Sequence, residues 1–108
     1  SFGRNMGYES RAVIAVDNTI YTDVTWGEDK PEDINTHGDR TFYSFEWDKG
    51  VERAVLHFLD NIAKKDEDGD IIEENYGIII IGEELDDIVT YGEWWEFDME
   101  LVRSIVIY

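Results

Sequence analysis

The first apolar pattern in the chain predicts a β-hairpin. Residues 11–16 (RAVIAV) form a short apolar run with β-branched side chains, and residues 19–26 alternate apolar and polar positions. Asp17 and Asn18 lie between the two runs, and both residue types favour turns. A hairpin is the simplest interpretation, with a short helix over residues 19–26 as the alternative.

A polar segment separates this hairpin from a third predicted strand. Residues 27–40 are rich in Gly, Asp and Asn, contain the proline of the chain and show no apolar period, which predicts a long loop. Loops of this length are uncommon in compact domains and are often functional or mobile. Residues 41–47 then alternate again, so we expect a strand with Tyr43, Phe45 and Trp47 on its buried face.

One segment carries the period of an amphipathic helix. Across residues 51–65 the apolar side chains follow a single helical stripe. Asp48 is the predicted N-cap, and Lys64 and Lys65 complement the C-terminal end of the helix dipole. We therefore predict one helix, followed by a turn at residues 66–70 (DEDGD). The stripe consists of Val51, Ala54, Val55, Phe58, Leu59 and Ile62.

Two further patterns complete the predicted fold. Residues 76–81 (YGIIII) are too short and too β-branched for a helix and lack polar alternation, which predicts a central strand covered on both faces. Residues 93–108 alternate before becoming apolar, which predicts one long strand, or two joined by a bulge near Arg103. Together the patterns predict a single α+β domain over residues 6–108, a mostly antiparallel sheet of about five strands with one helix packed on one face.

The composition supports a folded domain in a reducing compartment. The chain has 108 residues, of which 43% are hydrophobic, enough to form one core. It contains no cysteine, which excludes disulfide scaffolds, thiolate metal sites and cysteine nucleophiles. No segment approaches the ~18 apolar residues of a membrane span, so a cytoplasmic location is the default. We expect residues 1–5, which precede Met6, to be a vector remnant.

The charge balance points to basic partners. Asp and Glu number 26 against 9 Lys and Arg, for a formal net charge of -17. Such a chain repels nucleic acids and anionic membranes, and it is attracted to basic surfaces, including the grooves in which proteins bind phosphates. Solubility or adaptation to high salt would also explain the acidity, and charge alone does not separate these explanations.

No residue pattern predicts a calcium site. The turn DEDGD supplies Asp66, Asp68 and Asp70 at the first, third and fifth positions of a calcium loop. The sixth position, however, is Ile71 rather than Gly, and the twelfth is Gly77 rather than Glu. A solvated turn is the better interpretation.

The sequence evidence for other metal sites and for catalytic residues is equally weak. His37 lies near Asp33 and Asp39, which would allow a divalent metal, but neither it nor His57 has a second histidine or glutamate at ligand spacing. The serines lack a nucleophile-elbow context, and no glycine-rich loop is followed by Lys. We therefore predict no catalytic residue, no metal and no cofactor, and a metal-dependent enzyme using these three residues is a less favoured reading.

The most unusual stretch is residues 82–100 (GEELDDIVTYGEWWEFDME), which has eight carboxylates and no Lys or Arg. Successive strand residues point to opposite faces, so Trp95 is predicted in the core and Trp94 either under a loop or exposed as an anchor. The carboxylates beyond Trp94 would form a line at ~6.8 Å spacing, and the preceding loop could supply a second line. The predicted partner-binding residues are Glu83, Glu84, Asp86, Asp87, Trp94, Glu96, Asp98 and Glu100.

Short motifs spread over most of the chain carry a family resemblance. Residues 6–11 (MGYESR) precede an apolar strand, Tyr76-Gly77 opens a strand that ends in Gly82-Glu83-Glu84, and Tyr91-Gly92 and Arg103-Ser104 follow. In these motifs the chain resembles a loose group of small uncharacterised phage proteins. The resemblance implies a phage or prophage origin and brings no catalytic residues. It also favours a host-directed inhibitor similar to anti-restriction and anti-CRISPR proteins that mimic DNA.

The predicted function follows from the charge and the resemblance together. We expect a non-enzymatic phage inhibitor, located in the host cytoplasm, whose acidic face occupies a basic nucleic-acid-binding surface of a host protein. It would bind neither nucleic acid nor membranes directly. The alternative is a protein-interaction or self-assembly module, such as a homodimer formed through the exposed tryptophan face or a strand edge.

Overall fold

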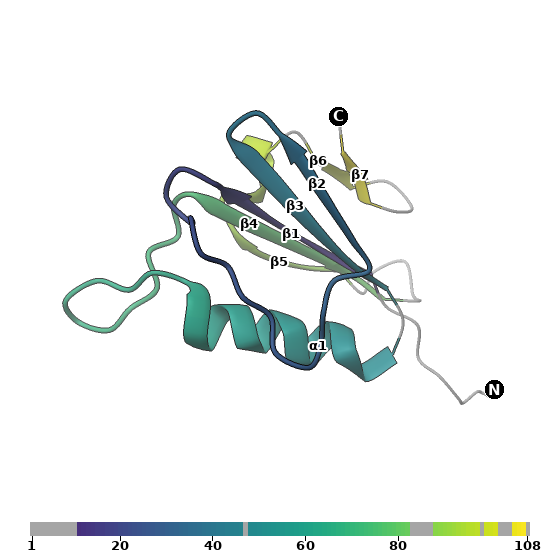
Figure 1. The fold of residues 1–108 in the computed structure, drawn as a ribbon, viewed down its shortest axis with the longest axis horizontal. Coiled ribbons are helices and arrows are strands. Elements are labelled where there is room, and N and C mark those ends of the chain that lie inside the picture. Colours follow the sequence, from purple (N-terminus) through teal and green to yellow (C-terminus); the bar gives the residue numbers. More distant parts are fainter. Residues whose placement is uncertain (1–10, 47, 83–87, 98, 102–104, 108) are drawn as a thin grey trace.

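The main element of the fold is an antiparallel sheet with the strand order β2-β3-β1-β4-β5 (Figure 1). The computed structural model describes residues 11–46, 48–82, 88–97, 99–101 and 105–107. The helix α1 (Asp48–His57) covers one face of this sheet. The predicted α+β class, with five strands and one helix, is therefore confirmed. The strands are β1 (Arg11–Asp17), β2 (Asp33–His37), β3 (Arg40–Glu46), β4 (Tyr76–Ile81) and β5 (Ile88–Gly92).

The predicted hairpin between residues 11–16 and 19–26 is wrong. β1 pairs with β3 on one side and with β4 on the other, while residues 19–26 form no strand and pass alongside the helix (Figure 1). The ring of Trp26 lies 5.0 Å from that of Phe45 and 6.3 Å from that of Phe58. Tyr21 is buried and Val24 and Trp26 pack against the same core, whereas Ile20 is exposed, so the apolar residues of this segment pack against the helix and the sheet without the alternation of a paired strand.

The predicted loop over residues 27–40 contains the edge strand β2. Its register with β3 pairs Thr36 with Thr41, and Gly38 makes the turn between them with φ of 64°. All five side chains of β2 are exposed. A strand without a buried face has no hydrophobic alternation, which is why its sequence resembles a loop.

The helix prediction is confirmed with small differences at its ends. α1 begins at Asp48 and continues into a π-helical turn, η1 (Phe58–Ile62), which ends when the Ala63 N–H donates to the Phe58 carbonyl at 2.8 Å. The side chain of Asp48 lies outside the described set, so its predicted capping role stays a prediction. Four residues of the predicted stripe are fully buried, namely Val51, Ala54, Val55 and Phe58.

The sheet has a hydrophobic core on each face. Ile78 packs in the core between sheet and helix, and its neighbour Ile79 packs in the core on the opposite face. This confirms that residues 76–81 form a strand covered on both sides. β3 was expected to bury one face only, but it also buries Phe42 in the second core. Trp47 lies outside the described residues.

The predicted long strand over residues 93–108 is wrong. The chain instead forms a short 3-10 helix, η2 (Trp94–Phe97), and a separate two-stranded sheet of β6 (Met99–Leu101) and β7 (Ile105–Ile107). β5 ends at Gly92 with φ of 66°, a left-handed conformation that turns the chain out of the sheet. β6 and β7 are antiparallel, so the chain reverses between them and is not one strand with a bulge.

Candidate functional site

The eight residues predicted to bind a partner are only partly described. Glu96 lies on η2, and Glu100 lies in β6, where its side chain is not described. Residues 94–97 form a 3-10 helix and not part of a strand. The prediction that the carboxylates follow a straight line along one strand is therefore wrong. The remaining acidic residues fall outside the described part of the chain: Glu83, Glu84, Asp86, Asp87 and Asp98.

The core position predicted for Trp95 is wrong, and Trp94 is not the exposed anchor that was one of the two environments predicted for it. Trp94 is half-buried against the second core, and Trp95 is 57% exposed, with its ring centroid 5.9 Å from that of Trp94. The prediction assumed strand alternation, whereas a 3-10 helix turns once in about three residues. Trp95, not Trp94, is therefore the exposed aromatic side chain of the pair.

A pair of glycines allows η2 to lie directly on the sheet. Gly77 in β4 is the cross-strand partner of Gly92 in β5. A Cβ atom on Gly77 would lie 2.4 Å from the Trp94 Cα, and one on Gly92 would lie 2.5 Å from the Tyr76 carbonyl oxygen. A side chain at Gly77 would prevent the close approach of η2, and one at Gly92 would collide with Tyr76 just before η2 begins, so the two glycines determine where η2 and its acidic residue Glu96 lie.

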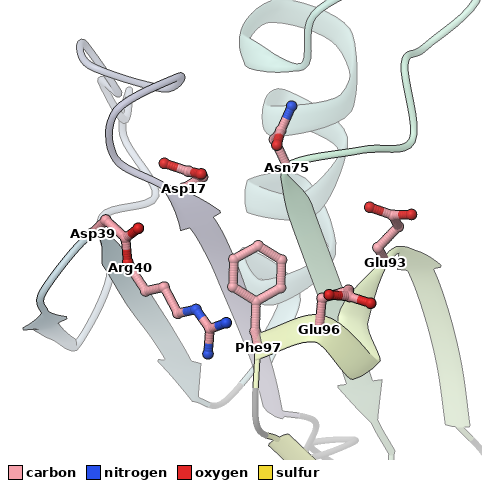
Figure 2. Close-up of a pocket in the computed structure, with 7 residues that line it drawn as sticks. All are labelled: Asp17, Asp39, Arg40, Asn75, Glu93, Glu96 and Phe97. Atoms are coloured by element: carbon pink, nitrogen blue, oxygen red, sulfur yellow. The ribbon is translucent and has the colours of Figure 1, made fainter.

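Four carboxylates gather at one end of the main sheet. In the antiparallel order, β1 and β5 end where β3 and β4 begin, so residues distant in sequence meet there. The four carboxylates, together with Arg40, Asn75 and Phe97, line a hollow of about 160 Å³. Figure 2 shows the Phe97 ring between Arg40 and the two glutamates. We refer to the four carboxylates as the acidic end: Asp17, Asp39, Glu93 and Glu96.

The acidic end has a defined internal structure. Phe97 is buried, and the Arg40 guanidinium carbon lies 5.6 Å from its ring centroid. Thr19 donates to the Asp17 Oδ1 through its hydroxyl at 2.6 Å and its backbone N–H at 2.9 Å, and these bonds lower the pKa of Asp17, with a smaller contribution from the charge of Arg40. Asp17 is therefore ionised at neutral pH, and four carboxylates share this end of the sheet with one guanidinium.

Removing the Thr19 hydroxyl should raise the pKa of Asp17. The Thr19→Ala variant loses the 2.6 Å bond, the largest cause of the lowered value, so the pKa should move toward the ~3.9 of an unperturbed aspartate. A depressed folded-state pKa stabilises the fold above the unfolded-state value, and this contribution is lost as the pH falls through the folded-state pKa. Carboxyl-carbon NMR titration measures the pKa directly.

Thr22→Ala, at an exposed position three residues further on, is the matched control and should leave the Asp17 titration unchanged. An unaltered pKa of Asp17 in the Thr19→Ala variant would contradict the assignment of the Thr19 hydroxyl as its main cause.

The other sequence candidates have structural explanations. Asp66 Oδ1 accepts the N–H groups of Asp68 at 2.9 Å and Asp70 at 3.0 Å, so its carboxylate organises the turn, as the solvated-turn interpretation predicts. His37 is an exposed residue of β2 whose ring contacts that of Phe42 at 5.8 Å. Within the described ranges, no three His, Asp or Glu side chains are grouped so that they could hold a metal ion.

Three residues of the acidic end were not among the predicted partner-binding residues, although Asp39 was a candidate metal ligand in the less favoured enzyme reading. Asp17, Asp39 and Glu93 each lie beside the end of a strand. The correct strand order would have revealed them, because it places those strand ends together. The predicted hairpin and the predicted C-terminal strand gave a different strand order, in which these strand ends do not meet.

Comparisons of the chain with protein-family models, with curated proteins and with solved structures find no match. In the described parts of the chain, no helix has both the length and the apolar character needed to cross a membrane.

Proposed function

We propose that the chain is a phage-encoded, non-catalytic inhibitor that acts in the host cytoplasm by covering a basic nucleic-acid-binding surface of a host protein. The acidic end is the observation that carries this proposal, since it gathers carboxylates from separate segments around one hollow. Lys and Arg side chains that bind phosphates also form strong charge-assisted bonds with carboxylates. The phage origin rests on the resemblance of the sequence motifs.

The overall charge supports the same function. A net charge of -17 attracts a basic partner over long range and speeds encounter, and this attraction weakens as salt screens it. Trp95 is exposed and directly precedes Glu96, so it replaces Trp94 as the proposed aromatic anchor beside the carboxylates. An aromatic contact within a charged rim is typical of protein-binding surfaces.

Neutralising the acidic end should weaken partner binding by about fourfold or more, because four charge pairs at the surface contribute ~0.2–1 kcal/mol each. The partner is first captured from host lysate on the immobilised chain and identified by mass spectrometry, and its affinity is then measured by calorimetry at low and high salt. Duplex DNA should compete with the chain for the partner. The variant combines Asp17→Asn, Asp39→Asn, Glu93→Gln and Glu96→Gln.

The control variant removes the same number of charges elsewhere on the surface. It combines four substitutions at exposed positions, Glu28→Gln, Glu52→Gln, Asp60→Asn and Glu67→Gln. Equal affinity of the two variants for the captured partner would show that the acidic end is not the binding surface. A partner that duplex DNA does not displace from the chain would show that the covered surface is not one that binds nucleic acid.

A further inference from the structure

The edge strand β5 is apolar and exposed. It ends the main sheet on the side opposite β2 (Figure 1). Ile88, Val89 and Tyr91 are 36%, 41% and 37% exposed, and none of the five residues of β5 is charged or proline. Proteins usually protect edge strands with charges, prolines or bulges, as β2 does with Asp33. β5 has none of these protections.

The backbone of β5 is oriented to accept another strand. Glu93 N–H donates to the Tyr76 carbonyl at 2.8 Å, and the same register pairs Tyr91 with Ile78. Residues of an antiparallel strand direct their N–H and C=O groups alternately to the two sides. Counting along β4 from Tyr76, the groups of Ile78 also point toward β5, so those of its partner Tyr91 point toward β4. The groups of Thr90 then point away from β4, to the side where the described residues place no further strand.

The side chains of β5 favour an apolar partner strand. Tyr91 and Val89 are opposite Ile78 and Ile80, which belong to the core between sheet and helix or pack against it. They therefore lie on the helix side of the sheet, and they would pack against the side chains of an added strand. Aromatic and β-branched residues form favourable cross-strand pairs.

The acidic residues around β5 favour a basic partner strand over a second copy of this chain. The five residues before β5 include four carboxylates in the sequence, and Glu93 of the acidic end follows it directly. A second copy of this chain would bring another net charge of -17 and the same acidic residues on both sides of its own β5. A strand with Lys or Arg at its ends would instead be attracted.

We propose that β5 adds an extended segment of another protein to the sheet, with β-branched residues at the centre of that segment and Lys or Arg at both ends. This inference deepens the proposed function and rests on it for the basic character of the partner. The backbone of β5 supplies the hydrogen bonds, and Glu93, the residue directly after β5, supplies a charge complement at one end. At the other end the sequence itself places four carboxylates within the five residues that precede β5.

The test uses a synthetic capped peptide, Lys-Lys-Val-Thr-Val-Thr-Val-Lys-Lys, added to the full chain. NMR should show shifted amide signals at residues 88–92, and hydrogen exchange at the Thr90 amide should slow about tenfold or more. The Thr90→Pro variant removes the outward N–H and should weaken binding about tenfold. Thr90→Val keeps the N–H and should bind like the parent.

A second measurement does not depend on the folding of a variant. The same peptide with its central Val replaced by Pro should bind the unaltered chain more weakly, because it cannot continue the ladder. A peptide with Glu in place of each Lys should also bind more weakly, and equal binding of that peptide would overturn the basic class of partner.

The outcomes separate this inference from the proposed function. If the basic peptide binds equally well to Thr90→Pro and Thr90→Val, and equally well with or without its central Pro, the strand edge plays no part and this inference is overturned. Binding that still depends on the acidic end would then leave the proposed function intact. A dimer detected by sedimentation without peptide, and abolished by Thr90→Pro, would assign the edge to a second copy and overturn the inference.

Discussion

The Gly77→Ala variant should be about 1–3 kcal/mol less stable than the parent, the usual cost of forcing atoms into a well-packed site. The new Cβ would lie 2.4 Å from the Trp94 Cα and 2.8 Å from its backbone nitrogen. Because both are backbone atoms, no change of side-chain rotamer relieves the contact. Alanine is better than glycine within a strand by ~0.5–1 kcal/mol, which is smaller and does not reverse the sign.

The measurement is urea denaturation, followed by tryptophan fluorescence and circular dichroism. Gly27→Ala is the matched control, because a Cβ at the exposed Gly27 meets nothing within 4 Å, and it should be neutral or slightly stabilising. Equal stability of the two variants would contradict the close contact between β4 and η2.

The Gly77→Ala substitution should also disturb the acidic end. η2 carries Glu96 and Phe97, and both line the hollow. Displacing Trp94 from Gly77 moves this turn, so NMR signals of Glu96 and Phe97 should change more than those of Asp17 on β1. Loss of partner binding in a variant that is still folded would then link the glycine pair to the proposed function.

The Phe58→Ala variant should lose about 3–5 kcal/mol of stability, the typical cost of removing a buried aromatic ring. Phe58 is 0% exposed and lies where α1 passes into the π-helical turn. Its ring centroid is 5.7 Å from that of Tyr21 and 5.3 Å from that of Tyr76, so it joins the helix, the segment after β1 and the start of β4. A loss of this size is a large part of the ~5–15 kcal/mol that stabilises a typical domain.

Thermal and urea unfolding measure this effect, and Leu56→Ala is the control on the same helix. Leu56 is 52% exposed, so its truncation should cost well under half as much as the change at Phe58. Comparable losses of stability in the two variants would show that the Phe58 face of the helix is not the one that packs against the sheet.

The acidic end and β5 are continuous in the chain. Glu93 follows the last residue of β5, and its backbone N–H still bonds to β4 through the Tyr76 carbonyl. A basic segment paired with β5 would therefore have one charged end near the Glu93 carboxylate, whose backbone is held against β4. The two proposed contacts remain separable, since one depends on side-chain charge and the other on backbone N–H groups.

Elements with a buried face were determined by the sequence itself. The stripe from Val51 to Ile62 predicted the helix because its apolar period is a local property that packing against a sheet preserves. The runs at residues 11–16, 41–47 and 76–81 predicted β1, β3 and β4 for a similar reason, since buried strands need apolar, β-branched residues. These elements suffice to define the α+β class.

Only the tertiary structure determined the edge strands of the sheet and the position of the acidic end. β2 and β5 are exposed, so their formation depends on hydrogen bonds to a neighbouring strand, and their sequences need no buried face. η2 replaced a predicted strand because Gly77 and Gly92 permit a backbone contact that hydrophobic alternation does not encode. Asp17, Asp39, Glu93 and Glu96 come together only through strand order, which depends on long-range pairing and not on the local period of the sequence.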